Sequence, residues 1–169
     1  MFYEHLNREP VTATKRRAVR ELLAENKAKK NIITTSVITD LEVLPEKLAP
    51  EHADKEAAYR GQFDGVHMVS VEISSNVLML AREIRGRYYR PPPEGGGYAK
   101  MMDLGDAIHL ATAALLGVDA FHTRDDTDEK TKIPLVSLYE WAGEDRLCGR
   151  YDLKIVSPES DQGELDDIP

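Results

Sequence analysis

Two short stretches between residues 103 and 125 carry the side chains best suited to chemistry. The run DLGDAIHLATA begins at Asp103 and places Asp106 in the first turn of a predicted helix. The run FHTRD ends at Asp125, directly after a predicted strand. We expect this strand to lie in a parallel sheet and the helix to run antiparallel to it. Both carboxylates would then meet at the carboxyl edge of the sheet, where α/β proteins gather ligands.

A third carboxylate is expected to join this pair. Glu42 follows the apolar run at residues 31–34, on a helix for which Ser36 is a good N-terminal cap. Three carboxylates in one crevice repel each other unless a cation neutralises them, and oxygen-only ligands select Mg²⁺ or Mn²⁺. Such ions activate water and stabilise the attacking and leaving oxygens of a phosphodiester. The residue types therefore favour metal-dependent phosphodiester hydrolysis.

Composition narrows the class of protein. Cys148 is the only cysteine, which excludes an intrachain disulfide and a Cys-based zinc cluster. Since no apolar run approaches the roughly 20 residues of a membrane span and the N-terminus lacks a signal pattern, we expect a cytoplasmic protein with no membrane contact. The net charge of −8 is unusual for a protein that holds nucleic acid by charge alone.

Basic residues nevertheless gather in two places, over residues 15–30 and 82–90. Taken singly, each cluster is more typical of a solvated surface. Taken together, two basic faces around an acidic centre would also suit a polyanionic substrate held over metal ions.

Helical and strand patterns alternate along the chain. We expect helices at about 12–29, 36–44, 51–63, 75–87 and 104–116, and strands at 31–34, 66–71, 118–122, 134–138 and 153–156. Such alternation predicts an α/β fold with a parallel sheet. The Pro/Gly run at 91–97 is expected to be an exposed loop rather than a domain boundary. We therefore expect a single domain over residues 1–156 and an acidic, disordered tail over 157–169.

In motif order, the chain from about residue 15 to 156 resembles the PIN-domain ribonucleases, and most of all their toxin-type (VapC-like) members. Residues 36–44, with Glu42, resemble the second motif of that family. The run DAIHLATA from Asp106 is similar to the third motif, and the run from Thr123 to Asp125 is similar to the fourth. The resemblance implies a three-layer α/β/α fold with a central parallel sheet.

The resemblance also implies roles for individual residues. Glu42, Asp106 and Asp125 would be metal-binding acids, with Asp128 as an auxiliary ligand. Thr123 would be an active-site hydroxyl that positions a carboxylate or a water molecule. Further implications are RNA as substrate, Mg²⁺ or Mn²⁺ as cofactor, a homodimer and, for a toxin, a small antitoxin protein as partner.

One departure from the family pattern concerns the start of the chain. The family begins with a strand that ends in a metal-binding Asp, and nothing before Thr12 matches it. We therefore expect this strand and its acid to be missing, through a missed upstream start or in a truncated, degenerate member of weak or no activity. We favour the missed start, which predicts an intact native mass above 19.0 kDa; a mass of 19.0 kDa would contradict it.

Each singled-out residue also has a purely structural interpretation. Asp106 is the third residue after Asp103 and could complete a capping pair. Asp125 could belong to a polar turn, and Glu42 could be a surface residue at a helix end. His109, one turn after Asp106, is more typical of a packed core histidine than of a base or ligand.

Two further functions therefore remain open. One is a non-catalytic PIN-like module that binds RNA or a protein. The other is a metal-dependent phosphoesterase that acts on DNA or on a small nucleotide.

Overall fold

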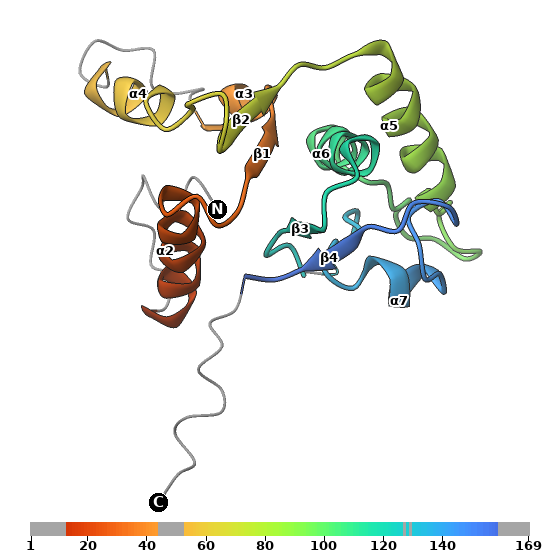
Figure 1. Cartoon of the computed structure of the whole chain (residues 1–169). Coiled ribbons are helices and arrows are strands. Elements are labelled where there is room, and N and C mark those ends of the chain that lie inside the picture. Colours follow the sequence, from red (N-terminus) through yellow and green to blue (C-terminus); the bar gives the residue numbers. More distant parts are fainter. Residues whose placement is uncertain (1–12, 44–52, 127, 129, 159–169) are drawn as a thin grey trace, which may run out of the picture.

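The computed structural model describes residues 13–43, 53–126, 128 and 130–158 (Figure 1). Helices and strands alternate in the described parts, so the predicted α/β class is confirmed. In chain order the elements are α2 (Ala13–Lys27), β1 (Ile33–Ser36), α3 (Thr39–Val43), α4 (Ala53–Arg60), β2 (Met68–Val71), α5 (Ser75–Tyr88), α6 (Leu104–Leu116), β3 (Ala120–His122), α7 (Leu138–Ala142) and β4 (Lys154–Val156).

The strands pair in parallel, as predicted. β1 pairs with β2 from Ile33 opposite Met68 onward, and β3 pairs with β4 from Ala120 opposite Lys154 onward. Within the described residues the two pairs form separate two-stranded sheets, so the expected central sheet is not continuous there. Helix α6 contacts both β1 and β3, and Figure 1 shows it between the two pairs. It is therefore the element that relates one pair to the other.

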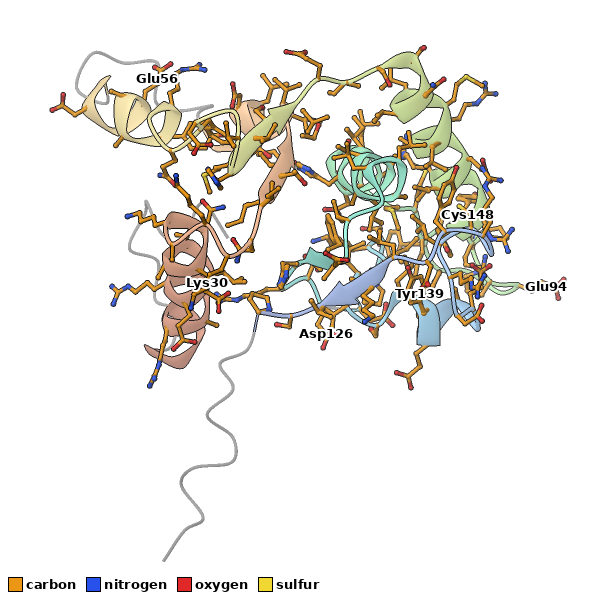
Figure 2. All side chains as sticks on the ribbon, in the orientation of Figure 1. Lys30, Glu56, Glu94, Asp126, Tyr139 and Cys148 are labelled. Carbon is orange, nitrogen blue, oxygen red and sulfur yellow. The ribbon has the colours of Figure 1, made fainter. Side chains whose placement is uncertain are left out.

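The main core lies around the contact between α5 and α6, which is the most extensive between any two described elements. Ile84 and Tyr88 of α5 and Leu110 of α6 are fully buried there. The alanines at 107 and 111 are also fully buried and let the two helices approach closely. Figure 2 shows side chains filling the space between α5, α6 and α7. This packing fixes the axis of α6, and with it the residues of its first turn.

Both ends of α6 are set by the residues predicted to set them. The Asp103 carboxylate accepts a hydrogen bond of 2.8 Å from the Gly105 amide, which makes Asp103 the N-terminal cap. Gly117 ends the helix in the left-handed region, with φ of 64°, and donates to the carbonyls of Ala113 and Ala114. Asp106 consequently lies in the first turn, as the sequence predicted.

Two local predictions were wrong. Ser36 does not cap a helix but is the last residue of β1, because the pairing with β2 continues to a bond of 2.9 Å from the Val37 amide to the Val71 carbonyl. Residues 134–138 do not form a strand: the amides of Leu135 and Val136 both donate to the Asp125 carbonyl, and α7 begins at Leu138. Two successive amides of one strand point in opposite directions and cannot share one acceptor.

The predictions for the missing first strand, before Thr12, and for the acidic tail beyond residue 158 concern residues outside the described ranges.

Candidate active site

The centre of the candidate site is Asp106, in the first turn of α6. Burial, and after it the negative charge of Asp125, raises the pKa of this carboxyl to about 6. Lys132 acts in the opposite direction, while Asp103 and Glu42 add smaller increases. Charges on neighbouring acids disfavour the ionised form of a poorly solvated carboxyl. The common crevice predicted for Glu42, Asp106 and Asp125 stays a prediction, and the effect of Asp125 on Asp106 is the observation that supports it.

Asp125 follows β3, and hydrogen bonds of its backbone amide and carbonyl fix its position. Its amide donates to the Thr123 hydroxyl over 3.2 Å. Its carbonyl accepts from the amides of Leu135 at 2.8 Å and Val136 at 2.9 Å. The Asp125 side chain is only 15 % exposed, and the Lys132 ammonium lies 2.8 Å from its Oδ2. Thr123 thus orients the backbone that carries Asp125, while Lys132 balances the charge of the carboxylate.

Glu42 extends from α3 to the first turns of α6. Its Oε2 lies 3.0 Å from Nε2 of His109, so His109 is hydrogen-bonded across two elements rather than only packed. Its Oε1 lies against Gly105, where an added Cβ would overlap with it. Glycine at 105 therefore makes room for this carboxylate. Since Gly105, Asp106 and His109 share two turns of one helix, α6 carries one acid and receives another.

Asp128, the predicted auxiliary ligand, is directed elsewhere. Its carboxylate forms an ion pair with the Lys100 ammonium, and its side chain is 56 % exposed. In the described structure the charge of Asp125 acts on Asp106, Glu42 of α3 contacts His109 of α6, and Asp128 pairs with Lys100.

The comparisons with known proteins bear on this arrangement. The PIN domain family matches the chain over residues 9–132. The chain belongs to the PIN domain family. No curated protein and no solved structure shows significant similarity to it. PIN domains have an α/β/α fold and are mostly ribonucleases that use divalent metals. In the described part of this PIN domain, no helix is long and apolar enough to cross a membrane.

The acids of this PIN domain fit a hard divalent cation in their chemistry. The donors are carboxylate oxygens, which Mg²⁺ and Mn²⁺ prefer. The raised pKa of Asp106 comes first from burial and then from the charge of Asp125, and a bound cation would relieve that repulsion. Among the described residues, no three His, Cys, Asp or Glu side chains converge closely enough to hold an ion. Asp106 and Asp125 therefore stay predicted ligands, and Glu42 is hydrogen-bonded to His109.

Sequence reasoning missed Lys132 and Gly105 and assigned His109 to the core. A lysine seven residues after Asp125 has no distinctive spacing, because the turn that returns it to the acid is set by backbone bonds from residues 135 and 136. Gly105 could have been recognised from the sequence. Glycine in a helix is unfavourable by about 1 kcal/mol relative to alanine, so its presence in the first turn beside a candidate metal ligand suggests a steric reason.

Proposed function

We propose that this PIN domain is a divalent-metal-dependent endoribonuclease. The observation that carries the proposal is the poorly solvated Asp106, whose pKa is raised to about 6 by burial and by Asp125, in a family composed mostly of metal-dependent ribonucleases. Asp106 and Asp125 would hold Mg²⁺ or Mn²⁺, with Glu42 as the third acid. When bound, the ion supplies an activated water and a positive charge for the phosphodiester oxygens.

The other residues of the site have supporting roles in this proposal. The N-terminus of α6 favours the charged form of Asp106, since the helix dipole attracts negative charge there. Thr123 fixes the backbone of Asp125 through its hydroxyl. His109 and Gly105 hold the Glu42 carboxylate against α6. Lys132 neutralises one carboxylate and would be available to a phosphate once a metal ion takes its place on Asp125.

The finer expectations from the family resemblance belong to the same proposal. We propose RNA as the substrate, a homodimer as the assembly and, if the protein is the toxin of a toxin–antitoxin pair, a small antitoxin as partner. We further propose that residues 1–156 form one domain and that Asp128 is at most an auxiliary ligand, because it pairs with Lys100 at the rim.

The test is cleavage of end-labelled single-stranded RNA by the purified chain in Mn²⁺. The controls are excess EDTA and the variant Asp106→Asn, which keeps the shape of the side chain but removes its charge. Cleavage that is lost in both controls supports the proposal. Cleavage of single-stranded DNA at a comparable rate would favour a broader phosphoesterase, and cleavage that persists in EDTA would contradict the metal-dependent mechanism.

A binding-only PIN module is the second candidate. The absence of three converging ligands among the described residues favours it, as does the Lys132 ammonium beside Asp125. This candidate predicts RNA binding with the same affinity in Mn²⁺ and in EDTA, and no cleavage in either. A thermal shift produced by Mn²⁺ and abolished by Asp106→Asn would argue against it.

A further inference from the structure

An exposed aromatic ring lies beside a lysine on the segments that lead away from the acids. Tyr98 is 61 % exposed, so its ring is open to a partner from solution. The Lys130 ammonium lies 5.9 Å from the centroid of its ring. This distance is within the range of a cation–π interaction, so the ring and the charge face the same small region of surface.

The segments that carry Tyr98 and Lys130 run side by side. The Met101 amide donates to the Thr131 carbonyl over 3.2 Å, and the Lys100 side chain pairs with Asp128. Lys100 also forms an antiparallel bridge with Arg90, and this bridge closes the Pro/Gly loop. Figure 2 shows Glu94, at the tip of this loop, pointing away from the rest of the protein. Tyr98 is therefore within this loop, two residues before the braced Lys100.

Both segments lead directly into the candidate active site. From Tyr98 the chain reaches Asp103, the cap of α6, in five residues, a distance of at most about 17 Å when fully extended. On the way, the Arg85 guanidinium donates to the Met102 carbonyl over 3.1 Å and anchors the segment to α5. From Lys130 the chain reaches Lys132, whose ammonium contacts Asp125. The Tyr98 ring is thus a few nucleotides from the acids.

We propose that Tyr98 and Lys130 form a subsite that stacks one base of single-stranded RNA while the scissile phosphate lies at Asp106 and Asp125. This inference rests on the proposed function. Every base has a π-face, and an exposed tyrosine offers it a flat partner without sequence preference. Lys130 and Lys132 place positive charge along the path of the phosphates between the ring and the acids.

The charge of the whole chain supports a local subsite. With a net charge of −8, the protein as a whole repels RNA, so any affinity must come from specific contacts. A base stacked on the ring, with its phosphate on Lys130, would supply such a contact.

The test measures RNA binding without cleavage. The chain with Asp106→Asn is titrated, in EDTA, into a fluorescein-labelled oligouridylate of about ten nucleotides, and Kd is read from anisotropy. We expect Tyr98→Ala to raise Kd by about 5- to 100-fold, and Tyr98→Phe, which keeps the ring, to stay within about 2-fold of the parent. Tyr89→Ala is the matched control, since Tyr89 is an exposed tyrosine (42 %) at the end of α5.

Three outcomes would overturn the subsite: equal Kd for Tyr98→Ala and the parent, an equal loss for Tyr98→Phe, or an equal loss for Tyr89→Ala. RNA binding too weak to measure in the parent would overturn it as well. The proposed function is judged separately, by cleavage with the unmodified site in Mn²⁺. If the chain with unmodified Asp106 does not cleave RNA but Tyr98→Ala weakens RNA binding, the proposed nuclease activity is contradicted and the proposed subsite is supported. If it cleaves and Tyr98→Ala leaves Kd unchanged, only the subsite fails.

Discussion

Asp106 is the residue at which the demands of folding and of the proposed function oppose each other. Burial and the charge of Asp125 both disfavour its ionised form and raise its pKa to about 6. The folded protein therefore holds this proton more tightly than the unfolded chain, whose Asp pKa is near 3.8. The resulting stability is fully present below about pH 4 and is lost as the pH rises through about 6. At neutral pH the charge of Asp106 destabilises the fold, and a bound cation would neutralise this charge.

Asp106→Asn should therefore stabilise the metal-free protein. We expect a gain of about 1–2 kcal/mol near pH 7.5, less than the full pKa shift implies because the carboxyl is partly solvated. The change should also remove part of the rise in stability between about pH 6 and pH 4. Thermal melts of both chains in EDTA across this pH range provide the measurement. A variant less stable than the parent near pH 7.5 would show that the Asp106 charge is already neutralised.

Gly105→Ala should disturb the Glu42 carboxylate without removing any acid. The added Cβ would overlap with Oε1 of Glu42, so the carboxylate must leave His109 or shift along α6. We expect Mn²⁺ affinity, measured by calorimetry, to fall roughly tenfold, the usual effect of displacing a group that orients a ligand. In the background of Glu42→Ala the same change should have no effect on affinity.

Gly86→Ala is the matched control for this substitution. Gly86 lies within α5, and a Cβ there would meet nothing within 4 Å. It should leave Mn²⁺ affinity unchanged and raise stability by up to about 1 kcal/mol, since alanine is the better helix former. Equal Mn²⁺ affinity for Gly105→Ala and Gly86→Ala would mean that the position of Glu42 is irrelevant to the metal.

At the scale of elements, α6 joins the core to the site. Its buried face, with Leu110, belongs to the core that α5 also lines, while its first turn carries Asp106 and receives Glu42. Leu110→Ala should therefore destabilise the whole fold, by about 2–5 kcal/mol in urea unfolding. Leu115→Ala, on the same helix at a residue that is 43 % exposed, should change stability by less than about 0.5 kcal/mol. Similar losses for the two variants would contradict the packing of α6 described above.

The elements also show how far local sequence carries a prediction. The ends of α6 were predictable, because the Asp103 cap and the Gly117 stop are interactions within a few residues. The turn at residues 134–138 was not, because its amides bond to the carbonyl of Asp125, some ten residues earlier. Ser36 was misassigned for a similar reason, since pairing with β2 extends the strand as far as Ser36. The places of Asp106 in the first turn of α6 and of Asp125 after β3 were predictable, because both follow from local sequence; their pairing at one edge rests on strand and helix polarity and stays a prediction.

On the scale of the whole molecule, the distribution of charge decides where a polyanion can bind. Several arginines of the cluster at 82–90 already have partners within the protein: Arg87 pairs with Glu144, Arg85 bonds to the Met102 carbonyl, and Arg90 lies over the Trp141 ring. These contacts connect α5 to the residues that follow it and lower the charge available to RNA. The basic cluster at residues 82–90 is therefore a weaker candidate for RNA binding than Lys130 and Lys132.

This distribution predicts a shallow dependence of RNA binding on salt. Each phosphate contact with single-stranded nucleic acid contributes about −0.7 to the slope of log K against log salt concentration. If Lys130 makes the main contact, and Lys132 contributes at most one more because it pairs with Asp125 in EDTA, the slope for the Asp106→Asn chain should lie between about −0.7 and −1.4, and Lys130→Gln should reduce its magnitude by about 0.7. A slope steeper than about −4 would instead require many phosphate contacts and would return the binding surface to the arginines and lysines of α2 and α5. Because the measurement counts released ions, it separates these surfaces even when their affinities are equal.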